Sequence, residues 1–332
     1  MKLDRTQLSK MIHHVLSYDF DEQGELHFRR FTEAQREAYK AASLDWFIRT
    51  KASAGVTFDF VTDSAYIVLQ MKLDTASSKT WSDFDLYIDG IFTNRKKFPD
   101  IDAKLLHFIL PEGEHRITLY FPWTVETVVS AVYLSDGASV KAVSKKAKAI
   151  VIGDSITQGY ITEYTSLTYT NRLARELELE LVNQGIGGCR CEESTIDESL
   201  LCYKPDLIVF AYGTNDYTKY DAREEFCRNT SRYLEKLTSL FPQTKIVALL
   251  PIYRNDGNHQ TREIFREYSF EDARNILLET YAGYKNITVV KETKIPHIPE
   301  VFAPDYLHPN ELGFQYMAEA IIDVVKDEME LK

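Results

Sequence analysis

The chain has 332 residues and a formal net charge of −11, from 50 acidic and 39 basic residues. Because no long Lys/Arg cluster offsets this charge, we expect neither nucleic acid nor an anionic membrane as a partner. No apolar stretch has the length of a signal peptide or a membrane span, and the chain length favours two domains. The sequence therefore predicts a cytoplasmic two-domain protein.

Short runs of alternating apolar and polar residues extend from about residue 45 to 135. These runs are GVTFDFVTDS, AYIVLQMKL, DFDLYIDG, HRITLYFP and VVSAVYLSDG. A period of two puts one face of each strand on a core, which predicts an antiparallel β-sandwich or jelly roll. The first forty residues are more helical, notably FTEAQREAYKAA. Together they predict an N-terminal domain over residues 1–140, followed by a small, polar and basic junction.

The second half of the chain, residues 146–332, alternates strands and helices. Buried strands are predicted for KAIVI, LVN, DLIVFAY, KIVALLP and ITVV. Amphipathic helices are predicted for YTNRLARELELE, AREEFCRNTSRYLEKLTSLF, TREIFREYSFEDARNILLETYAGY and ELGFQYMAEAIIDVVKDEM. Such alternation predicts an α/β domain, a parallel sheet covered by helices on both faces.

Four cysteines lie in this second half, at spacings that match neither a zinc ribbon nor a secreted disulfide framework. They are Cys189, Cys191, Cys202 and Cys227. We expect free thiols, no metal site and no cofactor.

The segment AKAIVIGDSITQG, residues 147–159, places a serine directly after a strand. An apolar run that ends in Gly153 predicts a buried parallel strand and a sharp turn at the C-terminal edge of the sheet, where ligands bind. Ser155 at such a turn is a candidate nucleophile, next to backbone N–H groups that can hold a developing negative charge. The alternative is a serine that only caps the following helix.

Polar residues also follow the other predicted strands, and parallel strands bring such residues to one edge. The segments are Gln184–Gly188 after LVN, Gly213–Asp216 after DLIVFAY, and Asp305–Pro309 before the last helix. His308 is a candidate general base, and Asp305 can hold its second ring nitrogen from three residues earlier.

A serine, a glycine, an asparagine and an Asp–His pair, each following a strand, form the block pattern of SGNH (GDSL-type) hydrolases. Residues 147–328 resemble this family. The resemblance implies a flavodoxin-like three-layer α/β/α domain with a parallel sheet, preceded here by an all-β, jelly-roll-like sandwich. It also implies a catalytic triad of Ser155, His308 and Asp305. Ile156 stands where the family's name tetrapeptide has Leu.

The same resemblance implies an oxyanion hole with three donors. These are the N–H groups of Ser155 and Gly188 and the side-chain amide of Asn215. Gly188 is preferred over Gly185 and Gly187, because the family's donor glycine lies five residues after the Asn that ends the second strand.

Four residues that flank these blocks are candidates for substrate binding. They are Tyr160, Tyr217, Tyr306 and His297. Aromatic rings beside polar groups suit sugar faces, and the loop position of His297 suits a substrate contact; the alternative is ordinary packing. The stretch RNDGNHQTREIFREYSF is expected to overhang the site and to set the acyl or alcohol preference.

A β-sandwich joined to this type of hydrolase is similar to two-domain carbohydrate O-acetyl esterases, including acetyl xylan esterases. The segment DFDLY also resembles a GxDLY-type motif that precedes some SGNH domains, with Asp83 in place of Gly. These resemblances imply a serine esterase that hydrolyses O-acyl, foremost O-acetyl, esters of carbohydrates through an acyl-enzyme.

Two alternatives stay open. One is a lipid or thioester esterase, and the other is a non-catalytic carbohydrate-binding protein. The expected partner is a small-molecule or oligosaccharide ester, and self-association into a homo-oligomer is compatible with the sequence.

Overall fold

The computed structural model describes residues 1–254, 267–291 and 294–329. The chain divides into two compact units. The β unit comprises Met1–Phe31, Ile48–Lys145 and Glu163–Ser166, and the α/β unit comprises Thr32–Phe47, Lys146–Thr162 and Leu167–Lys332. Two segments thus differ from the domain boundaries expected from the sequence, since 32–47 falls in the α/β unit and 163–166 in the β unit.

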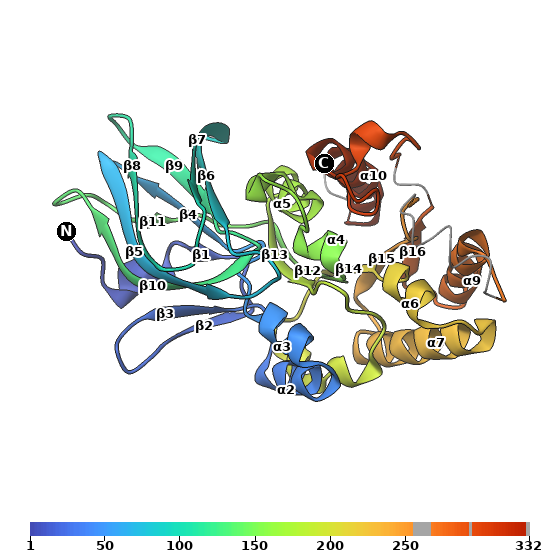
Figure 1. The fold of residues 1–332 in the computed structure, drawn as a ribbon. Helices are drawn as coiled ribbons and strands as arrows, with labels where there is room; N and C mark the ends of the chain where they lie inside the picture. Colours follow the sequence, from blue (N-terminus) through green and yellow to red (C-terminus); the bar gives the residue numbers. More distant parts are fainter. Residues whose placement is uncertain (255–266, 292–293, 330–332) are drawn as a thin grey trace. The chain divides into compact units, whose positions relative to one another are not determined.

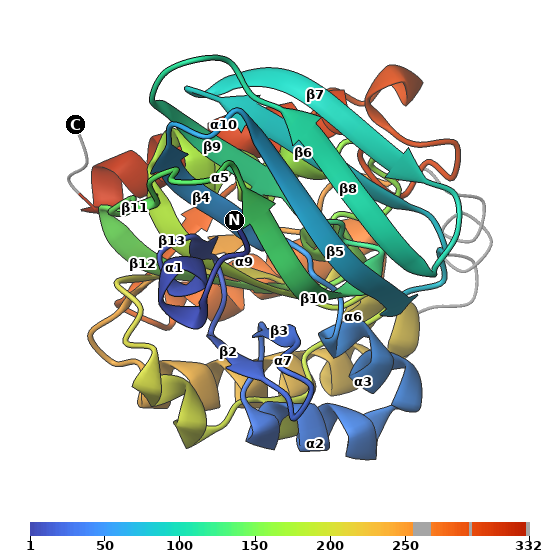
Figure 2. The ribbon, with the colours of Figure 1, turned by 90° about the vertical axis from the view of Figure 1, so that its left-hand side faces the viewer.

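Two antiparallel sheets make up the β unit (Figure 1). One has the order β1-β4-β9-β6-β7 with β11 paired to β4, and the other has the order β2-β3-β10-β5-β8, onto which Figure 2 looks. The elements are α1 (Arg5–Ser9), β1 (Ile12–His13), β2 (Ser17–Phe20), β3 (Leu26–Arg29), β4 (Thr57–Thr62), β5 (Tyr66–Thr75), β6 (Ser82–Ile88), β7 (Ile91–Phe98), β8 (Ala103–Ile109), β9 (His115–Tyr120), β10 (Val125–Leu134) and β11 (Lys141–Ala142). The predicted all-β sandwich is confirmed.

Aromatic side chains from both sheets fill the core of the β unit. The Phe121 ring lies 4.9 Å from that of Phe58 and 5.1 Å from that of Phe28, both edge to face. Such pairs contribute beyond the apolar area that they bury. The alternation of buried and exposed residues along β5 follows from this packing, because successive side chains point to opposite faces.

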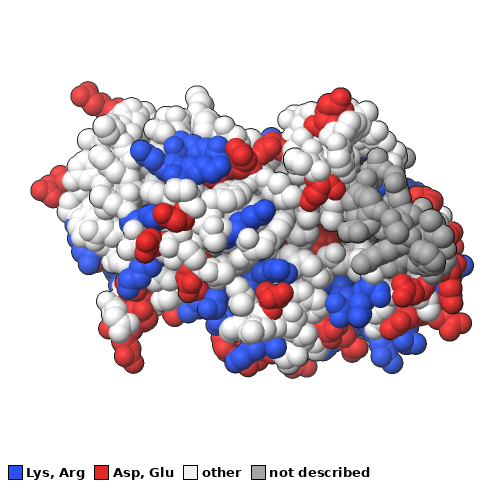
Figure 3. Space-filling view, in the orientation of Figure 1, with Lys and Arg blue, Asp and Glu red and all other residues white. Residues whose placement is uncertain are grey.

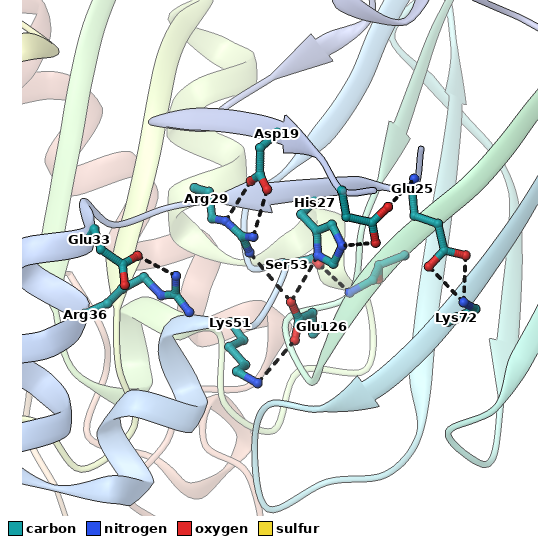
Figure 4. A network of polar contacts seen from close by, with 12 residues as sticks. Asp19, Glu25, His27, Arg29, Glu33, Arg36, Lys51, Ser53, Lys72 and Glu126 are labelled. Atoms are coloured by element: carbon teal, nitrogen blue, oxygen red, sulfur yellow. Dashed lines mark hydrogen bonds and ion pairs between the residues drawn. The ribbon is translucent and has the colours of Figure 1, made fainter. Parts of the chain in front are cut away.

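Leu26 and Phe28 of β3 lie in the apolar core, and charged side chains add further contacts within the β2–β3 hairpin and to its neighbours (Figure 4). Arg29 pairs with Asp19 at 2.8 Å, and His27 lies 3.3 Å from Asp21. Glu126 on β10 lies 3.7 Å from Lys51 and 3.8 Å from Arg29. The strand β2 is mostly exposed and carries no apolar period, and β3 is only four residues long, which is why the sequence did not predict the hairpin.

A buried carboxylate links β4 to β9 and to the end of the β unit. Asp59 is 1% exposed and accepts from Arg116 at 2.9 and 2.8 Å, from Thr118 at 3.2 Å, and from Lys145. Burial alone would raise the pKa of Asp59, but the two cations outweigh it and hold that pKa well below its usual range.

The α/β unit contains a parallel five-stranded sheet in the order β13-β12-β14-β15-β16. Its elements are α2 (Glu33–Ala42), α3 (Leu44–Thr50), which runs into the β unit, β12 (Ala147–Gly153), α4 (Ser155–Gln158), α5 (Tyr169–Glu176), β13 (Leu179–Gly185), β14 (Leu207–Ala211), α6 (Thr214–Lys219), α7 (Arg223–Leu240), β15 (Lys245–Leu249), α9 (Phe270–Ala282), β16 (Ile287–Val290) and α10 (Glu311–Met329). Short 3-10 turns lie at Thr165–Leu167, Glu193–Thr195, Glu198–Cys202 and Pro299–Val301.

Helices cover both faces of this sheet (Figure 1). On one face, Val209 of β14 shares an apolar cluster with Leu173 of α5 and Phe314 of α10. On the other, Phe210 of β14 packs against Tyr233 of α7 at 5.6 Å and Tyr281 of α9 at 6.0 Å. Adjacent residues of one strand therefore serve opposite layers, and the predicted three-layer α/β/α arrangement is confirmed.

The predicted helices of the second half match α7 and α10 closely, while α5 ends at Glu176, before the predicted end. Part of the predicted helix before α9, and most of the stretch expected to overhang the site, lie in 255–266, outside the described residues. Among the residues that are described, none of the helices is long and apolar enough to cross a bilayer.

We predict that Asp59→Asn lowers the free energy of unfolding by about 3 kcal/mol, because it removes the buried carboxylate that pairs with Lys145 and with the half-buried Arg116. Urea denaturation of the full chain measures this change. Asp136→Asn is the control, because Asp136 is 97% exposed in its ion pair with the amino terminus, and such pairs contribute at most about 1 kcal/mol. Equal effects of the two substitutions would contradict the prediction.

Candidate active site

The strand β12 ends at Gly153, and the chain turns at once into α4. Asp154 caps this helix, since its carboxylate accepts the Ile156 N–H at 2.9 Å. A Cβ on Gly153 would lie 2.0 Å from the Thr157 hydroxyl oxygen, so only glycine allows α4 to lie this close to the strand. Ser155 stands at the first turn of α4 and is half-buried.

A continuous chain of hydrogen bonds joins Ser155 to His308 and Asp305. The Ser155 hydroxyl oxygen lies 2.7 Å from His308 Nε2, and His308 Nδ1 lies 2.6 Å from an Asp305 carboxylate oxygen. The other Asp305 oxygen accepts the backbone N–H groups of Leu307 at 3.1 Å and His308 at 3.0 Å. With Nδ1 protonated and bound to the carboxylate, Nε2 is free to accept the proton of the hydroxyl.

The loop that carries His308 is held rigidly ahead of α10. The Ala303 N–H donates to the His308 carbonyl at 2.8 Å, and the Asn310 N–H donates to the Val301 carbonyl at 3.0 Å. A Cβ on Gly313 would lie 2.3 Å from that same Val301 carbonyl, so the start of α10 also approaches the loop closely.

The surroundings of the Asp305 carboxyl group favour its ionised form. Burial raises the pKa of its carboxyl, but hydrogen bonds from the ring and backbone of His308 outweigh burial and lower the pKa to about 2. An ionised carboxylate at this position stabilises the imidazolium that forms when His308 takes a proton.

The glycine-rich turn after β13 leaves only one of three candidate N–H groups free. The Gly185 N–H donates to the Asn183 side chain at 2.8 Å, and the Gly187 N–H donates to the Gln158 side chain at 2.7 Å. Gly188 is exposed, with φ at 75°, and no acceptor within the described part of the chain takes its N–H. The same holds for the N–H of Ser155.

Asn215, at the start of α6, is fixed by the same turn. Its side-chain amide donates to the Cys189 carbonyl at 2.9 Å, which leaves a second amide hydrogen for another acceptor. The Ile186 N–H donates to the Gly153 carbonyl at 3.0 Å, so a hydrogen bond joins this turn to the end of β12, two residues before Ser155. Three free donors therefore belong to segments tied together at the end of the sheet.

Sequence reasoning missed the side chains that anchor these segments. Asp216 is completely buried and accepts the Cys191 N–H at 2.9 Å; burial raises the pKa of this carboxyl to about 6. Asn183 donates to the Thr157 carbonyl at 2.7 Å, in addition to accepting from Gly185. The signal was present, since a polar side chain at the buried end of a strand needs a backbone partner.

Two of the four predicted substrate residues lie beside the Asp305–His308–Ser155 chain. The Tyr160 ring is half-buried and lies 5.4 Å from the His308 ring. Tyr306 follows Asp305 directly and is 44% exposed.

The other two predicted substrate residues have different surroundings. The exposed His297 ring stacks on Tyr253 at 4.0 Å and lines a cavity with Arg274 and Lys294. The prediction for Tyr217 is wrong, because its side chain is 1% exposed and packs edge to face against Tyr268 and Phe270 in the core. On α6, a step of two residues from Asn215 turns the side chain towards the interior.

All four cysteines are free, as predicted, and Cys189 and Cys191 are buried. Burial raises the pKa of the Cys189 thiol to about 12, so this thiol stays protonated and inert.

The sequence of the α/β unit decides the family. Residues 151–316, half of the chain, match the profile of the GDSL-like lipase/acylhydrolase family. The chain belongs to this family. Membership makes this GDSL-like protein an ester-bond hydrolase and confirms the resemblance inferred from the strand-end residues. A comparison with curated protein sequences finds no match.

Solved structures match this acylhydrolase over both units. The salicylyl-acyltransferase SsfX3 from a tetracycline biosynthetic pathway has a TM-score of 0.82 at 20% identity, covering 100% of this chain and 99% of its own. A putative GDSL-like lipase from Bacteroides ovatus has a TM-score of 0.77 at 19% identity, covering 100% and 98%. An acetyl xylan esterase from Butyrivibrio proteoclasticus has a TM-score of 0.64 at 16% identity, covering 97% and 96%. These likenesses show a shared two-domain fold.

We predict that Asn215→Ala lowers kcat for ester hydrolysis by about 100- to 1000-fold, as expected for the loss of one oxyanion donor. Asn229→Ala is the matched control, because Asn229 also donates its side-chain amide to a backbone carbonyl, that of Glu225 at 2.8 Å, but lies within α7. Steady-state kinetics with a p-nitrophenyl ester measures both. A kcat for Asn215→Ala within a few-fold of that for Asn229→Ala would remove Asn215 from the site.

We also predict that the Asp305 carboxyl titrates near pH 2, below its usual value of 3.8. Because folding favours the ionised form, its contribution to stability is fully present above about pH 4 and is lost as the pH falls through about 2. Carbon NMR of carboxyl-labelled protein measures the midpoint, and Asp305→Asn identifies the signal. A midpoint at or above the usual value would show that the hydrogen bonds to His308 do not hold in solution.

Proposed function

We propose that this GDSL-like acylhydrolase removes O-acetyl groups from carbohydrates through an acyl-enzyme on Ser155. The observation that carries the proposal is the unbroken hydrogen-bond chain of Asp305, His308 and Ser155, with contacts of 2.6 and 2.7 Å. Nucleophile, base and orienting carboxylate lie within hydrogen-bond reach of one another, which is the geometric requirement for activating a serine.

The first half of the reaction forms the acyl-enzyme. The Ser155 oxygen attacks the ester carbonyl carbon while His308 Nε2 takes the hydroxyl proton. The N–H groups of Ser155 and Gly188 and the amide of Asn215 donate to the resulting oxyanion. When the intermediate collapses, the bond to the sugar oxygen breaks, and the imidazolium of His308 gives its proton to that oxygen.

The second half returns the enzyme to its starting state. A water molecule attacks the acetyl carbonyl and gives a proton to His308, and the same donors hold the second oxyanion. Collapse releases acetic acid and restores the Ser155 hydroxyl with the proton from His308. Asp305 stays ionised throughout and holds the imidazole ring in place.

The substrate class rests on the structural neighbours and on the side chains around the site. An acetyl xylan esterase and a carbohydrate esterase in complex with cellohexaose share the fold, the latter with a TM-score of 0.66 at 16% identity over 85% of this chain and 94% of its own. Tyr160 and Tyr306 supply rings next to His308 and Asp305, and such rings suit the apolar faces of sugars.

A second candidate is acyl transfer to an alcohol, favoured by the likeness to a salicylyl-acyltransferase over 100% of this chain. The two reactions share the acyl-enzyme and differ only in whether water or an alcohol accepts the acyl group. Thin-layer or mass analysis of products formed with and without added sugar acceptors separates them, because only transfer yields a new ester.

We predict that Ser155→Ala lowers kcat for p-nitrophenyl acetate by more than about 10⁴-fold, the scale on which triad serines contribute. Ser194→Ala is the control, because Ser194 is an exposed serine of the same unit whose hydroxyl donates to the Glu192 carboxylate at 2.9 Å. A fluorophosphonate probe should label the wild-type and Ser194→Ala proteins and leave Ser155→Ala unlabelled. Labelling of Ser155→Ala would overturn the assignment of the nucleophile.

We predict that turnover of p-nitrophenyl esters is highest for acetate and falls for butyrate and octanoate, and that acetylated oligosaccharides release acetate. Initial rates across the ester series and an enzymatic acetate assay check this. Turnover that rises with acyl length would favour the lipid or thioester esterase, and labelling without any turnover would favour a binding protein.

A further inference from the structure

Two neighbouring side chains of α6 bind the turn that follows β13. The Asn215 amide donates to the Cys189 carbonyl at 2.9 Å, and the Asp216 carboxylate accepts the Cys191 N–H at 2.9 Å. All four residues belong to the α/β unit. We call Gly188–Cys191 the donor segment, because it begins with the N–H that is proposed to bind the oxyanion. The first turn of α6 therefore holds the donor segment at two points.

Buried carboxylates are uncommon in this chain. Figure 3 shows Asp and Glu side chains spread over the visible surface. Within the part of the chain that the structure describes, five acidic side chains are buried, namely Asp59, Asp83, Asp85, Asp154 and Asp216. Of these, only Asp154 and Asp216 lie in the α/β unit. Asp154 directly precedes Ser155, and Asp216 directly follows Asn215. Both therefore adjoin a group of the proposed site.

The burial of Asp216 costs free energy that its packing alone does not require. Its second oxygen, Oδ2, is buried and has no hydrogen-bond partner among the described residues. Burial raises the pKa of the carboxyl to about 6, although the hydrogen bond from the Cys191 N–H lowers it. An apolar side chain of similar size would fill the same space without this cost. The bond to the Cys191 N–H is therefore the feature that distinguishes Asp216 from such a side chain.

The donor segment is held on both sides of the carbonyl that Asn215 binds. Before this carbonyl, the Cys189 N–H donates to the Ile186 carbonyl at 3.0 Å. After it, the next backbone bond is the one from the Cys191 N–H to Asp216. The direction of the Cys189 carbonyl depends on both bonds, and this carbonyl in turn orients the Asn215 amide. Gly188 directly precedes Cys189, so the direction of its N–H depends on the same bonds.

We propose that Asp216 is a positioning residue for the oxyanion hole. By accepting the Cys191 N–H, it fixes the donor segment, and the fixed segment directs the Gly188 N–H and the Asn215 amide towards one point. The helix α6 thus supplies one oxyanion donor through Asn215 and orients two donors through Asp216. This inference rests on the proposed function, because Gly188 and Asn215 must be donors to the oxyanion.

The test compares Asp216→Leu and Asp216→Asn in the full chain, with p-nitrophenyl acetate as substrate. Asp216→Leu keeps an apolar side chain of similar size and removes the acceptor. We expect it to lower kcat by about 10- to 100-fold with KM within about twofold, since a small misplacement of reacting groups costs this much. Asp216→Asn keeps an oxygen that accepts the Cys191 N–H and should recover most of the kcat.

An inhibitor that mimics the oxyanion gives a second readout. A trifluoromethyl ketone adds to a serine hydroxyl and forms a tetrahedral oxyanion. Its inhibition constant should rise in Asp216→Leu by about the same factor as kcat falls, because both depend on stabilisation of the oxyanion. An unchanged inhibition constant would contradict the positioning role.

A double variant tests whether Asp216 acts through the oxyanion donors. The loss of kcat in Asn215→Ala/Asp216→Leu should be smaller than the product of the two single losses, because residues that act through one network are not additive. A loss equal to that product would show that Asp216 acts independently of Asn215 and would overturn the inference.

Two controls separate positioning from stability. Asp197→Ala removes a carboxylate that accepts another backbone N–H of the α/β unit, that of Ser199 at 2.8 Å. Leu237→Ala truncates a completely buried side chain of α7. At a temperature where circular dichroism shows every variant folded, both should have the kcat of the wild type. If Asp216→Leu does not fold, Asp216→Ala replaces it. A kcat for that variant equal to that of Leu237→Ala, or no recovery in Asp216→Asn, would overturn the inference.

Fluorophosphonate labelling separates this inference from the proposed function. A wild-type chain that is neither labelled nor active overturns the assignment of Ser155. A wild-type chain that is labelled and active, together with an Asp216→Leu chain of equal kcat, leaves that assignment intact and overturns only the positioning role.

Discussion

The close approach of α4 to the ends of β12 and β13 is the constraint on which the site depends. A Cβ on Gly153 would lie 2.0 Å from the Thr157 hydroxyl oxygen, and one on Gly185 would lie 2.2 Å from the Gln158 nitrogen. Neither neighbour can give way, because Thr157 bonds to the Tyr169 hydroxyl at 2.7 Å and the Gln158 nitrogen is backbone. The absence of side chains at Gly153 and Gly185 thus sets the height of Ser155 above the sheet, where its hydroxyl oxygen lies 2.7 Å from His308 Nε2.

Side-chain acceptors, more than apolar contacts, fix the loops around this approach. Asn183, Gln158 and Asp216 each take one backbone N–H of the turn that follows β13. Each bond removes one donor from those that a ligand could use, and no acceptor among the described residues takes the N–H of Gly188. The bonds that hold this turn in place therefore also determine which of its backbone donors stay available to a ligand.

The structure could be predicted from the sequence wherever a local pattern of residues is compatible with only one local structure. The run that ends in Gly153, and the Asp–His spacing before α10, indicated that Ser155, Asp305 and His308 lie together because parallel strands share an edge, and hydrogen bonds join the three side chains in the structure. The exposed edge strand β7 has no apolar period to detect, and its side chains are mostly exposed. Tyr217 shows a second limit of prediction from the sequence. Its closeness in sequence to Asn215 does not reveal in which direction its side chain points from the helix.

The order of the units along the chain has a consequence for how the protein is made. Helix α2 is synthesised before most of the β unit, yet the Gln35 amide exchanges hydrogen bonds of 3.2 and 3.1 Å with Gln184, which follows 149 residues later. At ribosomal rates this helix waits roughly 7 to 30 s for the strand that it covers. The amphipathic face of α2 therefore has no partner from β13 during that time. Because each unit is built from several segments of the chain, the two units cannot be exchanged between proteins by cutting at one boundary.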